Sequence, residues 1–196
     1  MSSNTHMEKI RTLLEEIQKL DDIHRNAKGK PTKNPMVLYA PAAPDAVRSL
    51  IEGGWSHPLP PSFGNFLAAS DGVTQFRGQL DFLCTDAVRQ EPIRSVIDQK
   101  IQADKIDLRA MFKQVDNAVI AEWESDPKRF YVANHPVIAV TKTGGLLFYD
   151  SRTRDSKGEM ELCWRSAWKA VIEKRCRNIE NYLEASLQEL KDSTKA

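Results

Sequence analysis

The 196 residues are enough to bury the core of one domain, and 41% hydrophobic with 28% charged residues favours a folded chain over a disordered one. Its 28 basic and 27 acidic residues give a net charge of +1, without the basic excess typical of nucleic-acid-binding proteins. The apolar run around Leu146 to Tyr149 is too short to span a bilayer, and no charged-then-apolar leader opens the sequence. These features predict a cytoplasmic protein with neither a membrane nor a nucleic-acid partner.

The residues that most often hold metals or form disulfides are sparse and scattered. The three cysteines, Cys84, Cys163 and Cys176, are odd in number and predict buried free thiols in a reducing compartment. None of the four histidines pairs with another His or Cys at the spacing of metal ligands. The sequence therefore predicts no metal site and no cofactor.

Residues 1–43 are predicted to form an amphipathic helix followed by a linker. Apolar residues recur at helical spacing between Glu8 and His24, with charges on the other face. Prolines and lysines then mark Asn26 to Pro44 as a linker or long surface loop. The helix either packs on its own domain, which we favour, or docks on a partner. Residues 44–196 form the remaining domain.

The next stretch predicts two short helices separated by a break. Asp45 is a candidate N-cap for a helix that ends at Gly53-Gly54. A proline-rich elbow follows, and Pro61 suits the first turn of a second helix, where its missing N–H costs no hydrogen bond. Asp71-Gly72 ends that helix. Its predicted buried residues are Phe63, Phe66 and Leu67.

Strands and a long helix are expected in the middle of the chain. Phe76 and residues 80–83 predict the first strand, and Asp86 to about Val115 is helical in pattern, with Pro92 starting a new helix or bending this one. The expected buried residues of this helix are Val88, Ile93, Val96, Ile97, Ile101, Ile106, Leu108 and Met111. Residues 118–121 predict a short strand.

The clearest pattern is a β-hairpin in the second half. Residues 136–141 and 146–150 are the clearest predicted strands, and Thr143-Gly144-Gly145 supplies the turn between them. Residues 160–164 predict a further strand. A helical region is expected from Trp168 to Leu190.

No arrangement of residues predicts catalysis. The glycine pairs lack the context that cradles phosphate, and no Gly-x-Ser-x-Gly elbow is present. Asp45 with the later Glu189-Leu190-Lys191 imitates a metal-dependent nuclease signature, but both fall on predicted helices far apart in sequence. We interpret this match as chance and expect no enzyme.

Two loops carry residues typical of recognition surfaces. Trp123, Phe130 and Tyr131 lie in an irregular, charged segment, where they are either binding anchors or covers for the sheet. Arg152, Arg154 and Asp155 follow a strong strand, in a loop that is either a recognition loop or simply solvated.

The stretch from Gly53 to Gly72 resembles the signature of the SUKH superfamily, which includes bacterial immunity proteins and a fungal cell-wall synthesis regulator. That signature runs Leu-Pro, a small or acidic residue, an aromatic residue, a short variable stretch, Phe-Leu, then Asn/Asp-Gly. The residues that match are Gly54, Trp55, Leu59, Pro60, Phe63, Phe66, Leu67, Asp71 and Gly72. The hairpin and the segment Ile179-Glu180-Asn181-Tyr182-Leu183 resemble later family elements, so the resemblance covers about residues 44–190.

The resemblance implies an α+β fold, a central and mainly antiparallel sheet wrapped by helices, with no catalytic site. It also implies an immunity protein that binds a cognate toxin and occludes its active site; the alternative is a regulatory scaffold module. The expected toxin-facing loops are 74–79, 123–134 and 151–159, which add Arg77 and Glu124 to the candidate residues above. The long helix, the N-terminal extension and the neutral charge depart from the family pattern.

Overall fold

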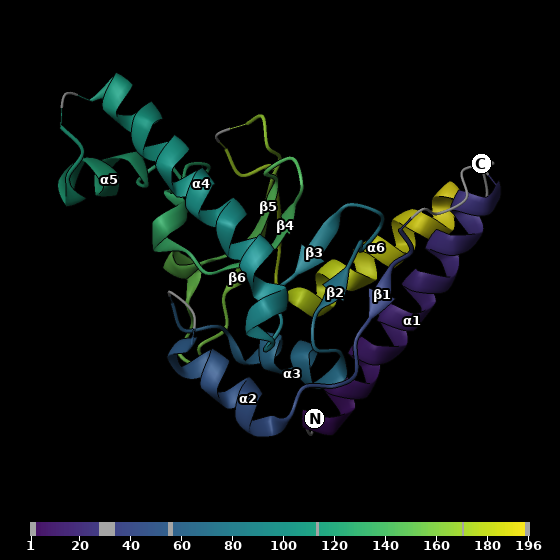
Figure 1. The fold of residues 1–196 in the computed structure, drawn as a ribbon. Coiled ribbons are helices and arrows are strands. Elements are labelled where there is room, and N and C mark those ends of the chain that lie inside the picture. Colours follow the sequence, from purple (N-terminus) through teal and green to yellow (C-terminus); the bar gives the residue numbers. More distant parts are fainter. Residues whose placement is uncertain (1–2, 28–33, 55–56, 113, 170, 195–196) are drawn as a thin grey trace.

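The computed structural model describes residues 3–27, 34–54, 57–112, 114–169 and 171–194, and these form an α+β fold (Figure 1). The α-helices are α1 (Ser3–Ala27), α2 (Pro44–Ser49), α3 (Pro61–Ala69), α4 (Ala87–Met111), α5 (Asn117–Trp123) and α6 (Ile179–Ser193). The strands are β1 (Val37–Leu38), β2 (Val73–Thr74), β3 (Leu80–Phe82), β4 (Val137–Thr141), β5 (Leu146–Asp150), β6 (Glu161–Arg165) and β7 (Lys174–Cys176). A π-helical turn (Leu50–Gly54) and two 3-10 turns (Val132–Asn134 and Ser151–Thr153) complete the elements.

The main sheet has the strand order β3-β4-β5-β6-β7, with every neighbouring pair antiparallel. The predicted hairpin is confirmed as β4 and β5, and the predicted strand at 160–164 as β6. We call one end of this sheet the Asp150 end; it carries Phe82, Val137, Asp150, Glu161 and Cys176. The opposite, Thr141 end carries Leu80, Thr141, Leu146, Arg165 and Lys174.

Helices cover both faces of the sheet, which explains why all residues of β4 and β5 are buried. Leu147 and Tyr149 belong to an apolar cluster with α1, α3 and α6, whereas Leu146 and Phe148 belong to a second cluster with α4. Figure 1 shows α1 lying along α6, and α1 also packs on α3. The favoured prediction for the N-terminal helix is therefore confirmed. Its buried core residues are Ile10, Leu14 and Ile17.

Helix α3 follows its predicted design. Pro61 occupies the first turn, and Phe63, Phe66 and Leu67 are fully buried, with Leu59 and Pro60 also buried. The chain leaves the helix at Ser70 and turns at Gly72, whose φ of +84° lies in the left-handed region. A Cβ at that position would lie 2.8 Å from the Cβ of Cys84, so both the turn and the space require glycine. Trp55 lies outside the described residues.

One local prediction before α3 is wrong and one is confirmed. Asp45 is not the N-cap of α2, because the helix begins one residue earlier, at Pro44, with Ala43 as N-cap. The helical stretch ends at Gly53-Gly54 as predicted, and its last residues, Leu50–Gly54, form a π-helical turn. The interpretation of residues 26–44 as linker also missed β1, since a strand of two residues carries no periodicity. It pairs with β2, 35 positions away, through Val37–Thr74 and Leu38–Val73.

Four predictions after α3 need correction. Residues 118–121 belong to helix α5, because the Asp116 carboxylate accepts hydrogen bonds from the N–H groups of Ala118 and Val119 and caps a helix. The predicted helix from Trp168 begins only at Ile179, after β7. Pro92 lies inside a single helix, α4. On that helix Val88, Ile106 and Met111 are 83%, 66% and 54% exposed instead of buried, whereas Ile93, Ile97 and Leu108 are buried.

Candidate functional site

The fold brings two of the three predicted recognition loops together. Loops 123–134 and 151–159 both adjoin the Asp150 end of the sheet, because one leads into β4 and the other joins β5 to β6. Loop 74–79 leads into Leu80 and therefore lies at the Thr141 end. Its Arg77 adopts a φ of +48° and forms an ion pair with Glu189 of α6, 2.5 Å from Nη1 to Oε2. Arg77 is thus separate from the other candidates.

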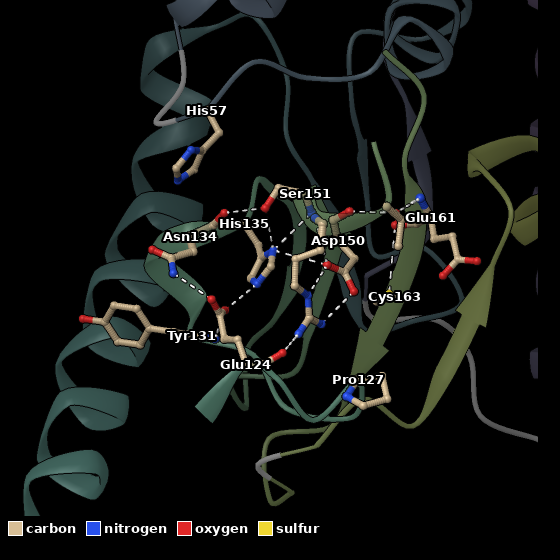
Figure 2. Close-up of polar contacts among 12 residues, drawn as sticks. His57, Glu124, Pro127, Tyr131, Asn134, His135, Asp150, Ser151, Glu161 and Cys163 are labelled. Carbon is tan, nitrogen blue, oxygen red and sulfur yellow. Dashed lines mark hydrogen bonds and ion pairs between the residues drawn. The ribbon is translucent and has the colours of Figure 1, made fainter. Parts of the chain in front are cut away.

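Asp150 is the centre of a buried polar network at this end (Figure 2). Its carboxylate is 1% exposed and accepts hydrogen bonds from Arg152 Nε and Nη2, both at 2.7 Å, and from Arg175 Nη1 at 2.9 Å. Burial opposes ionisation, but the two guanidinium groups outweigh it and lower the pKa of Asp150 to about 2. Asp150 is therefore a fixed negative charge at neutral pH.

The two arginines join the loops to the sheet. Arg152 Nη1 donates to the backbone carbonyls of Glu124 at 2.6 Å and Arg129 at 3.0 Å. Arg175, on the edge strand β7, donates from Nη2 to the carbonyl of Pro127 at 2.5 Å. Charged hydrogen bonds to backbone carbonyls hold a loop by its main chain, so the conformation of 124–129 depends on Asp150 through these two residues.

His135 extends the network to the side chain of Glu124. It is 2% exposed, and its Nδ1 accepts a hydrogen bond from the N–H of Ser151 at 3.2 Å, so the neutral ring carries its proton on Nε2. Nε2 lies 2.8 Å from Glu124 Oε1, which also accepts from the N–H of Tyr131. Burial raises the pKa of Glu124, but the hydrogen bonds from His135, Tyr131 and Asn134 outweigh it and the pKa is lowered.

Ser151, His135 and Glu124 contact one another in that order and are the residue types of a hydrolytic triad. Their geometry, however, holds the two loops in position. Ser151 Oγ lies 3.0 Å from His135 Nδ1 and donates to the carbonyl of Asn134 at 2.8 Å. Nδ1 is already engaged by a backbone N–H, so the ring has no free nitrogen to take the hydroxyl proton. Cys163 is similarly unreactive, since burial raises the pKa of its thiol to about 12.

Loop 151–159 is also attached to the N-terminus of α3. Glu159 Oε1 accepts a hydrogen bond from the N–H of Ser62 at 2.8 Å. Asp155 closes the loop by accepting from the N–H groups of Lys157 and Glu159. Three buried atoms beside this contact, Tyr149 Oη, Ser62 Oγ and Glu159 Oε2, have no hydrogen-bond partner among the described residues. Helix α3, which carries several of the signature residues, therefore contacts loop 151–159.

The aromatic candidates lie mostly inside the molecule. Phe130 and Tyr131 are 3% and 5% exposed, and Phe130 stacks on Phe148 with ring centroids 4.2 Å apart. Of the two alternatives for Phe130 and Tyr131, the burial favours covers for the sheet, because the segment after α5 turns inward. Trp123 is half-buried, with the Arg129 guanidinium 4.2 Å from its ring centroid. Arg154 is exposed.

Sequence reasoning missed His135 and Arg175. A lone histidine with no partner at ligand spacing carries no signal, and Arg175 was placed in a helix. Asp150 offered the better clue, since a carboxylate at the end of a fully apolar strand must find cations or stay neutral.

In comparisons with known proteins, no protein-family model, curated protein or solved structure matches the chain. Within the described ranges, no three or more His, Cys, Asp or Glu side chains gather so as to hold a metal ion. None of the helices described is long and apolar enough to cross a membrane.

Proposed function

We propose that the protein is an immunity protein, which binds a cognate toxin and blocks its active site with the loops at the Asp150 end. The observation that carries this proposal is the network of Asp150, Arg152 and Arg175, which fixes the main chain of two charged loops to one end of a rigid sheet. Loops already ordered before binding lose little conformational entropy in a complex, which favours a tight stoichiometric inhibitor. The motif between Gly53 and Gly72 supports the same family of proteins.

The chemistry of the site agrees with a binding role. The residues that could react are engaged in structural contacts: His135 and Cys163 are buried, and Ser151 is half-buried. The exposed residues of the two loops include the charged side chains of Lys128, Arg154, Asp155 and Lys157. Charged side chains on ordered loops supply specificity and fast association in protein complexes.

The structure gives little support to the scaffold alternative. The feature that favours a scaffold is the apolar stripe of the N-terminal helix, if that stripe docks on another protein. In the fold, Ile10, Leu14 and Ile17 of that stripe are buried in the domain's own core. Ile23 is 48% exposed and is the remaining part of the stripe that faces solvent among the described residues.

Co-expression with the toxin domain encoded beside this gene tests the proposal. We expect restored growth and a complex of the two chains that survives gel filtration. The variant Asp45→Asn, on a side chain that is 92% exposed and away from the loops, should restore growth as well as the wild type does. Failure of a folded wild-type protein to rescue growth, together with separate elution of the two chains, would refute the proposal.

A further inference from the structure

At the Asp150 end, several carboxylates are buried, whereas the cations of the same segments are exposed. The carboxylates of Glu124 and Asp150 are 11% and 1% exposed, and one oxygen of Glu159 is buried. The cations of the same segments reach solvent. Four exposed side chains have neither a hydrogen bond nor an ion pair with any described residue: Lys128, Arg154, Lys157 and Arg177.

The exposed carboxylates nearby neutralise these cations only in part. Asp126 forms an ion pair with Arg129 at 3.3 Å, and Glu161 forms one with Arg175 at 2.9 Å. Asp155 is exposed between Arg154 and Lys157, so its charge offsets one of the four cations. A chain of almost zero net charge therefore presents an excess of positive charge at this end.

The tertiary structure gathers these cations from three separate segments. Lys128 lies in loop 123–134, directly after Pro127, whose carbonyl accepts a hydrogen bond from Arg175 Nη2 of the Asp150 network at 2.5 Å. Arg154 and Lys157 lie in loop 151–159. Arg177 follows Cys176, which pairs with Leu162 at the Asp150 end.

We propose that the Asp150 end docks on an acidic surface of a partner protein. This inference rests on the proposed function for the partner, a toxin, and goes beyond it by assigning the sign of charge on the toxin's docking surface. Unpaired cations on fixed loops attract an acidic patch over a distance of about a Debye length, roughly 8 Å at physiological salt, and so accelerate correct encounters.

An acidic protein fits this surface better than a nucleic acid does. Proteins that hold single strands stack bases on exposed aromatic rings. Here Phe130 and Tyr131 are buried, and the ring of Trp123 lies under Arg129.

A matched pair of charge-reversal variants tests the inference. K128E/K157E changes one unpaired lysine in each loop. K19E/K142E makes the same change at two exposed lysines without described partners, on α1 and on the hairpin turn at the Thr141 end. All four side chains are on the surface, so both variants should fold, which circular dichroism verifies.

The first measurement uses isotope-labelled protein and NMR, with a decaglutamate peptide and a ten-nucleotide oligothymidine as probes at low salt. We expect the peptide to shift amides of 126–129 and 152–158 in the wild type and in K19E/K142E, and to shift them far less in K128E/K157E. Shifts elsewhere, equal shifts in both variants, or tighter binding of the oligonucleotide at these loops would overturn the inference.

The second measurement is the association rate with the toxin from the co-expression experiment. We expect K128E/K157E to lower the rate about tenfold at low salt and K19E/K142E to leave it nearly unchanged. Equal rates for both variants would overturn the acidic-surface inference and leave the proposed function standing. Absence of any wild-type complex would refute the proposed function, and the peptide titration would still decide the charge of the ligand.

Discussion

Two regions of this protein are held together by different forces. The pair of helices α1 and α6 packs over α3 through apolar side chains such as Leu14 and Leu183, both fully buried. The loops at the Asp150 end are held by a buried carboxylate and two arginines. Apolar packing is non-directional and depends on the volume of a side chain, whereas the polar network depends on single atoms and on pH.

The placement of the buried ion pairs separates the two regions. In the helix pair, Asp21 and Arg25 form a buried ion pair within α1, at 6% and 23% exposed. Ion pairs between helices, such as Lys191 with Glu16, have side chains that are 45% and 50% exposed. Exposed pairs of this kind are screened by water and salt and contribute little to stability. At the Asp150 end, removal of one partner leaves a charge inside the protein. The comparison predicts that mutations in the two regions change the free energy of unfolding differently. Truncating a buried apolar side chain should have a large effect, and removing a single polar group a smaller one.

The largest effect is expected for Phe66→Ala on the apolar side. Phe66 is fully buried, with its ring centroid 5.3 Å from Phe63 and 5.0 Å from Phe82. Truncation leaves a cavity and should lower the free energy of unfolding by about 3–5 kcal/mol, measured by urea denaturation. The control, Ile23→Ala on exposed α1 surface, should change it by less than about 0.5 kcal/mol. A small loss for Phe66→Ala would contradict the packing described here.

Asp150→Asn should have the next largest effect, and it should depend on pH. The folded pKa of about 2 lies below the ordinary value of 3.8, so Asp150 stabilises the fold above about pH 4. That stabilisation, roughly 2 kcal/mol, is lost as the pH falls toward 2.

Urea denaturation of Asp150→Asn at pH 7 and at pH 3 measures this pH dependence. The variant should be less stable than wild type at pH 7 and approach it at pH 3, and its amides at 124–131 should exchange faster with solvent. Asp45→Asn, on an exposed side chain, is the control and should show no such pattern. A difference from wild type that stays constant with pH would show that the ionised carboxylate does not hold the loops.

Glu159→Ala should loosen the contact between loop 151–159 and α3. It removes the acceptor for the N–H of Ser62 at the start of that helix, and should lower the free energy of unfolding by about 1.5 kcal/mol. Glu159→Gln keeps an amide oxygen for this hydrogen bond and should lose less. Equal losses for the two variants would mean that the charge of Glu159, more than its hydrogen bond, holds the loop.

Tyr149→Phe should have the smallest effect, and the opposite sign. The Tyr149 hydroxyl is buried, and it lacks a hydrogen-bond partner among the described residues. Removing an unsatisfied polar group should raise the free energy of unfolding by up to about 1 kcal/mol, again from urea denaturation. A loss of 1 kcal/mol or more would show that the hydroxyl is hydrogen-bonded, through a water or through Ser62.

Apolar periodicity alone determined much of the fold of this protein. The stripes of α1 and α6, the buried aromatic residues of α3 and the two apolar runs of the β4–β5 hairpin can each be read within one segment, because each depends on local sequence. The same reasoning failed where the signal was short or mixed. Residues 118–121 resemble a strand, and their helix depends on the cap at Asp116.

The tertiary structure alone decided how the candidate site is built. β7 forms because Lys174, Arg175 and Cys176 pair with the edge of β6. No local sequence pattern predicts that this edge is available. Asp150 and Arg175 are 25 positions apart, and Glu124 and His135 meet across a turn. Polar networks carry no period along a chain. Their partners are chosen by distance and burial after the apolar core has formed, so the loops of the candidate site could be named from the sequence, but the contacts between them could not.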